Sequence, residues 1–161
     1  DNNSIPVVRV MPNMPALIQQ GATAICRNDN VSDIDFDYVR SLFNTTGTTV
    51  TIDEYLMDAV TGLSGSGPAY VFSFIEGLID GGVKSGLSRD IATELAVQTV
   101  VGSATLMART GEHPAVLRDR VTSPGGTTAS GIHVLERSGF KGTLIGAVEA
   151  ACHRSQELGK G

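Results

Sequence analysis

Residues 118–128 hold the side chains whose types and spacing are best suited to chemistry in this chain. A proline and two adjacent glycines stand between hydroxyl side chains, in the order Ser123-Pro124-Gly125-Gly126-Thr127-Thr128. Glycine lets the backbone adopt a positive φ and approach a ligand closely. The start of a following helix offers free N–H groups and a positive dipole end, which suit a carboxylate or a phosphate. The segment predicts a small-anion site, but its spacing also fits an ordinary Ser-Pro-Gly-Gly turn followed by a threonine N-cap.

Other patterns that could carry chemistry are weaker. His113, His133 and His153 have no helical metal-ligand spacing and no accompanying acidic pattern, so we expect no metal site. The glycines of residues 62–67 reverse the order of a dinucleotide-binding fingerprint and follow a helical pattern instead of a strand. The serines near them have no adjacent base that would mark a nucleophile.

The composition is that of a globular protein. Of the 161 residues, 41% are hydrophobic and 18% are charged, and the net charge is −5. This acidic balance argues against a nucleic-acid partner, because no basic stripe is present to displace counterions. Cys26 and Cys152 are far apart and lack CxxC spacing, which favours reduced thiols and a cytoplasmic location. No secretory pattern opens the chain, and its start without methionine predicts an excised fragment.

An uncharged run covers residues 59–75 and is the one candidate for a membrane segment. It contains glycines, a proline and several hydroxyl side chains, so the run is less apolar than a helix that spans a membrane. We interpret the run as a buried helix pair and expect no membrane partner.

The first part of the chain, residues 1–53, has a mixed pattern. Strands are predicted over residues 7–11, 22–27 and 48–52, which are rich in valine, isoleucine and threonine. Between the last two, Ser32 can cap a helix over residues 33–43. Its predicted apolar face comprises Ile34, Val39, Leu42 and Phe43. This order of elements is typical of the end of an α/β domain and is too short to form a whole one.

The second part, residues 54–161, is predicted to be entirely helical. Two helices are expected over residues 56–63 and from Pro68 towards Gly86, with a break at residues 65–68 between them. A third follows the Ser88 cap over residues 89–109. Further helices are expected over residues 114–117, around 132–136 and over 143–158. Glycines inside the helical patterns cost stability unless helices approach closely there; they are Gly62, Gly77, Gly102 and Gly146. Apolar residues also occupy more than one helix face, which predicts that a second subunit covers them.

Three segments together resemble pyrroline-5-carboxylate reductase, the enzyme family that makes proline. They are residues 8–16 (VRVMPNMPA), residues 56–70 (LMDAVTGLSGSGPAY) and residues 112–128, which end in VTSPGGTT. The resemblance extends from about residue 7 to residue 158. It implies the end of a Rossmann domain in residues 1–53, followed by a helical substrate-binding and dimerisation domain in residues 54–161 that interlocks with a partner.

The resemblance also implies a reaction and a site. The substrate is a cyclic imine carboxylate, which is reduced to proline by hydride from NADPH or NADH. The carboxylate would be held by Ser123 and by the N–H groups of Gly125, Gly126, Thr127 and Thr128, and the catalytic Thr128 hydroxyl would contact the ring nitrogen. Pro12 and Asn13 would contact the cofactor, whose main binding loop is absent from these residues. Residues 65–68 would close the pocket from the partner subunit. Met14 departs from the family's usual threonine.

Two classes of function follow for the chain. The first is part of a reductase that carries the substrate loop and forms a homodimer or a higher homo-oligomer, but is inactive alone. The second is a non-enzymatic helical oligomerisation module, in which residues 123–128 merely connect two helices.

Overall fold

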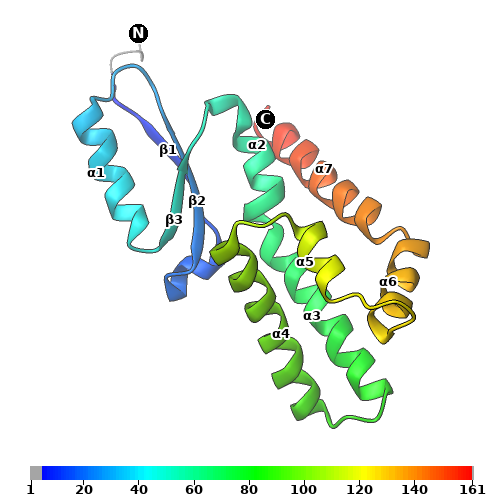
Figure 1. Ribbon diagram of the computed structural model, residues 1–161. Helices are drawn as coiled ribbons and strands as arrows, with labels where there is room; N and C mark the ends of the chain where they lie inside the picture. Colours follow the sequence, from blue (N-terminus) through cyan, green and yellow to red (C-terminus); the bar gives the residue numbers. More distant parts are fainter. Residues whose placement is uncertain (1–4, 161) are drawn as a thin grey trace. The chain divides into compact units, whose positions relative to one another are not determined.

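The computed structural model describes residues 5–160 and contains a small sheet followed by helices (Figure 1). The chain forms two compact units. One comprises the chain up to Tyr70 together with the segment from Leu144, and the other comprises Val71–Thr143. The predicted fold class, the end of a Rossmann domain followed by an all-helical domain, is confirmed by this content. The predicted domain boundary after residue 53 stays a prediction.

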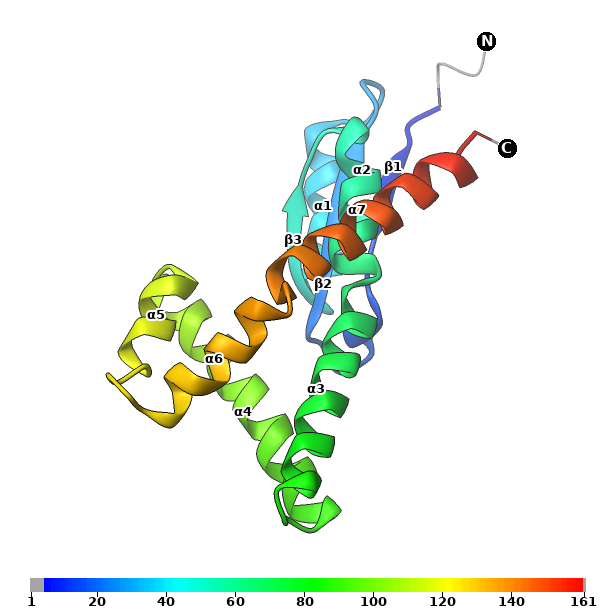
Figure 2. The ribbon, with the colours of Figure 1, turned by 90° about the vertical axis from the view of Figure 1, so that its right-hand side faces the viewer.

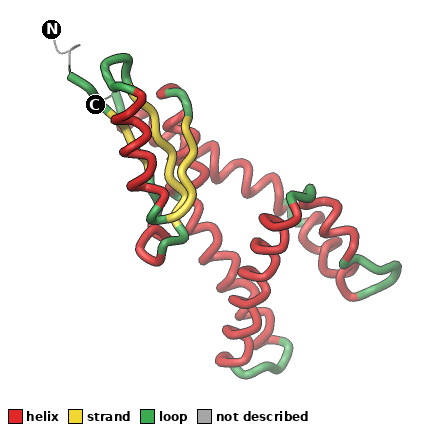
Figure 3. The backbone as a smooth tube through the Cα atoms, turned by 60° about the vertical axis from the view of Figure 1, so that its left-hand side comes forward, coloured by secondary structure: helices red, strands yellow, loops and turns green. Residues whose placement is uncertain are grey.

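Three strands form the sheet, in the order β1-β2-β3 (Figure 3). They are β1 (Val8–Met11), β2 (Gly21–Arg27) and β3 (Gly47–Thr51), each within one residue of its predicted bounds. β1 pairs antiparallel with β2, after the short 3-10 helix η2 (Met14–Ile18). β2 pairs parallel with β3 across helix α1, which is the connection expected of an α/β domain.

Helix α1 (Asp33–Asn44) begins as predicted, because the Ser32 hydroxyl accepts a hydrogen bond from the N–H of Asp35. The predicted apolar face is wrong in part. Phe36 is the buried residue of the helix, whereas Ile34 and Leu42 are 82% and 48% exposed. Phe36 packs with Ile25 of β2 and with Val31. The face predicted from the spacing of the aliphatic residues does not include Phe36.

The sheet buries both of its faces. On the side of α1, Ile25 packs with Val31 and Phe36. On the other side, Ala24 and Cys26 pack with Met57, the first residue of α2 (Met57–Val60). Alternate residues of β2 thus supply two cores, which is why this strand reads as a nearly continuous apolar run.

The helix that follows the sheet departs from the predicted helix pair. α2 continues into a π-helical segment, η4 (Thr61–Gly65), and only Ser66 separates η4 from α3 (Gly67–Lys84). The predicted break at residues 65–68 is therefore a local change of helix type. Pro68 lies in the first turn of α3, where its missing N–H is tolerated.

The remaining helices contain the residues predicted for them, and the last three extend three to five residues beyond the predicted bounds. Ser88 caps α4 (Arg89–Thr110), and Gly111 ends it with φ 65°. α5 (Pro114–Arg120) and α6 (Thr127–Arg137) follow. The last helix, α7 (Phe140–Leu158), begins three residues before the predicted Thr143, directly after Gly139 at φ 67°.

Helix α4 leaves most of its apolar residues exposed. Only Ala92 and Ala96 are buried among its residues, and exposed apolar side chains lie along its length: Ile91, Leu95, Val97, Val101, Leu106 and Met107. By length and composition alone, α4 is the one described helix that could cross a membrane. The run of residues 59–75 does not meet that criterion in the part of the chain that the structure describes.

The predicted close helix contact at glycines is found at one of the four positions named above. A Cβ atom on Gly62 would lie 2.6 Å from the carbonyl oxygen of Val148 and 3.0 Å from the amide nitrogen of Cys152, both in α7. α7 accordingly runs beside α2 and η4 (Figure 2). Gly77, Gly102 and Gly146 have no neighbour within 4 Å of such an atom in this chain.

We expect Gly62→Ala to destabilise the protein by about 1–3 kcal/mol, because both atoms it would meet belong to backbone that cannot rotate away. Gly81→Ala is the matched control, since a Cβ there meets nothing within 4 Å. The control should leave stability unchanged or raise it by up to about 1 kcal/mol. Thermal unfolding of both variants measures this, and equal melting temperatures would contradict the close approach.

Candidate anion site at the start of helix α6

The loop between α5 and α6 forms a tight turn. The N–H of Gly126 donates to the carbonyl oxygen of Ser123 at 3.0 Å, and Gly125 has φ 68°. Proline at the second position and a positive-φ glycine at the third are the signature of a type II turn. The turn places the Ser123 hydroxyl beside Gly126, where an added Cβ would overlap Ser123 Oγ. A side chain at Gly126 would therefore require the Ser123 hydroxyl to rotate away and the Ser123 carbonyl to shift by a few tenths of an ångström.

Helix α6 begins with free N–H groups. Gly126 is its N-cap and makes no side-chain cap, so the alternative of a threonine N-cap is wrong. Within residues 5–160, the N–H groups of Thr127, Thr128 and Ala129 have no hydrogen-bond acceptor, and that of Ser130 is the first to bond, to Gly126. Three unsatisfied donors at the positive end of an 11-residue helix favour an anion.

The Thr128 hydroxyl is also free. Several helical threonines donate their hydroxyl to the carbonyl four residues earlier: Thr61, Thr93, Thr99, Thr110 and Thr143. Thr128 makes no such bond with any described residue, because the residue four positions earlier is Pro124 in the turn. Thr128 is half-buried, and its hydroxyl is available to a ligand that occupies the helix start.

The structure brings the predicted loop residues together, but the N–H groups that are free to bind a ligand differ from the predicted ones. Ser123, Gly125, Thr127 and Thr128 all lie at the turn or in the first turn of α6. The N–H of Gly126 is occupied by the turn, and Ala129 supplies a donor that sequence reasoning missed. A helix starting at residue 127 has its first three N–H groups free, so placing the N-cap correctly would have identified Ala129.

Charged side chains connect the helices around this loop. Glu136 of α6 lies 2.8 Å from Lys141 Nζ at the start of α7 and 3.8 Å from Arg118 Nη1 in α5. The hydrogen bond and charge of Lys141 lower the pKa of Glu136 below its usual value. Arg118 also borders an apolar cavity of about 260 Å³ between the end of α4 and α5, which is lined by Ser103, Leu106, Met107, Pro114, Leu117, Arg118 and Val121.

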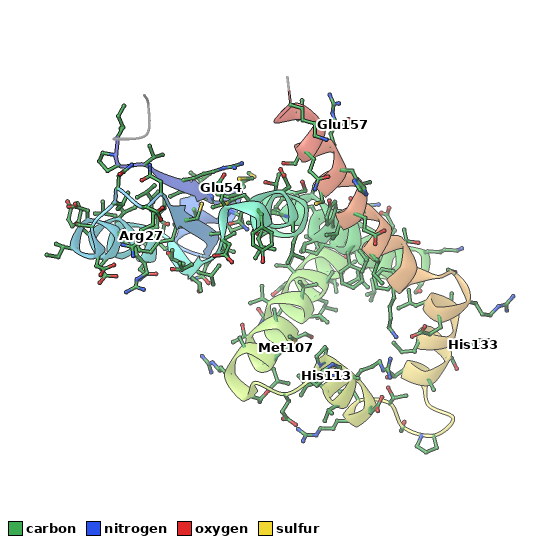
Figure 4. The ribbon with its side chains drawn as sticks, turned by 90° about the horizontal axis from the view of Figure 1, so that it is seen from above. Arg27, Glu54, Met107, His113, His133 and Glu157 are labelled. Atoms are coloured by element: carbon green, nitrogen blue, oxygen red, sulfur yellow. The ribbon has the colours of Figure 1, made fainter. Side chains whose placement is uncertain are left out.

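Of the histidines, His113 has a structural role, and His133 and His153 are exposed on their helices (Figure 4). His113 is the N-cap of α5, and its Nδ1 accepts a hydrogen bond from the N–H of Ala115 at 3.2 Å. His133 lies on α6 and His153 on α7. In residues 5–160 no three His, Cys, Asp or Glu side chains gather as metal ligands.

The predicted cofactor residues belong to the other compact unit. Pro12 and Asn13 follow the end of β1, and the Asn13 side chain makes two hydrogen bonds, to the N–H of Ala22 and to the carbonyl of Ser64. Among the described residues, none of the three strands is followed by a Gly-x-Gly-x-x-Gly turn. A cofactor contact at Pro12 and Asn13 therefore stays a prediction.

A cluster of Arg9, Cys26 and Glu54 joins the sheet to the first residue of the helical part. Glu54 forms an ion pair with Arg9 of β1 and accepts a hydrogen bond from the Cys26 thiol of β2 at 2.8 Å. Burial, aided by that bond, raises the pKa of Cys26 to about 11. The bonds from Cys26 and Arg9 lower the pKa of Glu54. Cys26 is thus a buried, unreactive thiol.

An open cleft lies in the compact unit that contains the sheet. Its volume is about 810 Å³, and it is lined by Arg9, Asp58, Ser155, Gln156, Leu158, Gly159 and Lys160. Ser155 already donates its hydroxyl to Asp58 there, at 2.5 Å. None of the predicted site residues lines this cleft.

The sheet and the helices define a class of protein: the end of a dinucleotide-type α/β domain joined to a helical domain with uncovered apolar faces. Residues 54–158 match the family described as pyrroline-5-carboxylate reductase dimerisation. The chain belongs to the pyrroline-5-carboxylate reductase family, as the resemblance of its motifs predicts.

Individual relatives agree with this assignment. The chain is 54% identical to pyrroline-5-carboxylate reductase of Synechocystis over 96% of its own length and 58% of the relative. It is 44% identical to human pyrroline-5-carboxylate reductase 2, covering 94% of this chain and 48% of that protein. The chain thus spans about half the length of the curated relatives it matches.

Solved structures show the same fold. The Plasmodium falciparum pyrroline carboxylate reductase with NADP bound superimposes with a TM-score of 0.91 at 45% identity, over 96% of this chain and 62% of that one. The enzyme from Coxiella burnetii gives a TM-score of 0.93 at 36% identity, over 96% and 58%.

Proposed function

We propose that this chain is the substrate-binding and dimerising part of an enzyme that reduces 1-pyrroline-5-carboxylate to proline. The observation that carries the proposal is the start of α6, where three free N–H groups lie beside the Ser123 turn and the free Thr128 hydroxyl. A carboxylate and an adjacent ring nitrogen are the groups that such donors would hold. Family membership supplies the reaction to which this site belongs.

The chain's own residues would position and polarise the substrate. The N–H groups of Thr127, Thr128 and Ala129 would hold the carboxylate, together with the Gly125 N–H and the Ser123 hydroxyl. The Thr128 hydroxyl would bond the ring nitrogen and assist its protonation, which makes the neighbouring carbon more electrophilic. Rigid donors of this kind contribute because they need no reorganisation during the reaction.

A nicotinamide cofactor, NADPH or NADH, would supply the hydride when bound. The turn at Pro12 and Asn13 is the part of this chain that we assign to its nicotinamide end. A relative with NADP bound supports this class of cofactor. The free thiols Cys26 and Cys152 support a reducing, cytoplasmic location.

Thr128→Ala tests the catalytic role in the full-length protein. We expect kcat to fall by about 10-fold or more while KM changes less than about 3-fold, because the bond that the hydroxyl donates strengthens as hydride transfer raises the electron density on the nitrogen. Thr128→Ser keeps the hydroxyl and should retain most activity. Because the N-cap of α6 is Gly126 and not Thr128, Thr128→Ala removes no cap, and we expect its melting temperature to be unchanged. Unchanged steady-state kinetics would remove Thr128 from the site and favour a loop that only connects helices.

We further propose that the chain forms a homodimer, or a multiple of one, through α4 and neighbouring helices. The exposed apolar residues of α4 and the open glycines Gly77, Gly102 and Gly146 support a close-packed partner helix. Obligate interfaces often bury more than about 2,000 Å² and resemble a core. We expect sedimentation at micromolar concentration to give a dimer or larger species; a stable monomer would contradict the proposal.

A further inference from the structure

We propose that Asn13 is a positioning residue whose side-chain amide ties the end of the sheet to the π-helical segment η4. It thereby holds the Pro12–Asn13 turn in place without binding the cofactor through that side chain. The inference rests on the proposed reductase function, because the turn matters only if it borders the hydride donor. Three observations within one compact unit support it.

The first observation is the register of the sheet. Met11 pairs with Ala24 at the end of the β1–β2 ladder, so Asn13 stands opposite Ala22. The backbone no longer pairs there, and Asn13 Oδ1 accepts the N–H of Ala22 at 2.9 Å. Asn13 also precedes η2, where asparagine is a favoured cap, but it makes no side-chain cap bond. Its side chain is directed to the ladder end instead.

The second observation is a carbonyl group that lacks its helical donor. The carbonyl of Ser64 would accept in an α-helix from the N–H of residue 68, and residue 68 is proline, which has none. The N–H of Ala69 donates to Ser66. Asn13 Nδ2 donates to the Ser64 carbonyl at 3.1 Å and satisfies it. Pro68 thus creates the acceptor that Asn13 uses.

The third observation is that η4 is fixed from its other side as well. Gly62 approaches the backbone of α7 closely, and the Tyr70 hydroxyl lies 3.3 Å from the carbonyls of both Gly62 and Ala147. Met11 Cε lies 2.6 Å from the position of a Cβ on Gly65. Asn13 therefore bonds to a segment that is itself held, so the turn cannot shift independently of it.

This arrangement predicts a specific division of kinetic effects. A residue that binds the dinucleotide through its side chain would weaken dinucleotide affinity when removed. A residue that fixes the turn would lower kcat, because the donor and the imine would meet in productive geometry less often. Binding of each ligand would change little. The two roles therefore give opposite results for the same variant.

The test compares Asn13→Ala with Asn44→Ala in the full-length protein that contains this chain. Asn44 is an exposed asparagine at the end of α1 with no side-chain hydrogen bond to any described residue. For Asn13→Ala we expect kcat to fall about 10-fold or more, with NADPH Kd and imine KM within about 3-fold. Its melting temperature should fall by roughly 4 °C. Asn44→Ala should change none of these values.

The same comparison in a Pro68→Ala background makes the test specific to Ser64. Residue 68 then has an N–H that can donate to the Ser64 carbonyl. In this background, Asn13→Ala should therefore lower the melting temperature by about half as much as it does in the protein with Pro68. An equal cost in both backgrounds would overturn the Ser64 link. A 10-fold weaker NADPH Kd with an unchanged melting temperature would instead make Asn13 a cofactor ligand. If the unmodified protein fails to reduce the imine, the proposed function fails, while the melting temperatures still decide the link.

Discussion

A polypeptide of these 161 residues is expected to show no NAD(P)H-dependent reduction of 1-pyrroline-5-carboxylate, whereas the full-length protein should reduce it. The described residues offer no glycine-rich turn after a strand to hold a pyrophosphate. Without that turn, the hydride donor is not held beside the imine. Positioning of reactants is commonly worth about 7–11 kcal/mol, so the expected loss of rate is at least about 10⁴-fold.

The measurement is cofactor oxidation by both polypeptides at equal site concentration. Thr128→Ala in the full-length protein is the control for contaminating host enzyme, because a contaminant's rate would not respond to that substitution. Measurable turnover by the purified 161-residue polypeptide, above about 10⁻⁴ of the full-length rate, would contradict the expectation that its residues cannot hold the pyrophosphate.

Gly126→Val is expected to abolish binding of proline and proline analogues while leaving the protein folded. A Cβ at this position would overlap Ser123 Oγ and lie 3.1 Å from the Ser123 carbonyl oxygen, so the Ser123 hydroxyl must rotate away from the helix start and the turn must adjust. The Ser123 hydroxyl and the helix start would then no longer face one ligand. Valine is also a poorer N-cap than glycine, and we expect a loss of about 1 kcal/mol in stability.

Gly131→Ala is the matched control for this substitution, because it lies on the same helix and a Cβ there meets nothing within 4 Å. Calorimetric titration with proline should give equal affinity for Gly131→Ala and the unmodified chain, and no measurable binding for Gly126→Val. Retained affinity in Gly126→Val would show that the carboxylate does not lie against this turn.

Much of the fold could be predicted from local sequence signals. Ser32 and Ser88 cap their helices as expected, and Gly111 ends α4 in the left-handed conformation. These features depend on a few adjacent residues, which is why the sequence reveals them. The face of α1 could not be predicted in the same way. Phe36 is buried because the neighbouring β2 and Val31 meet it, and that contact is set by the tertiary arrangement.

In the candidate site, too, the features set by adjacent residues could be predicted and those set by the tertiary structure could not. The loop residues 123–128 stand together in sequence, so their grouping followed directly from it. That Gly126 caps α6, which leaves the N–H of Ala129 free, depends on where the helix begins, and helix ends are uncertain in a sequence pattern. The bond between Asn13 and Ser64 joins residues 51 positions apart. Only Pro68 hints at it, by removing the N–H that the Ser64 carbonyl would otherwise accept.

The most direct test of the central claim, a carboxylate site at the start of α6, is an amide NMR titration of this chain with proline. Pyrrolidine, which lacks the carboxylate, is the matched ligand. We expect saturable shifts of the Thr127, Thr128 and Ala129 amides with proline and none with pyrrolidine. Proline binding that leaves these three amides unmoved, or equal shifts with pyrrolidine, would contradict it.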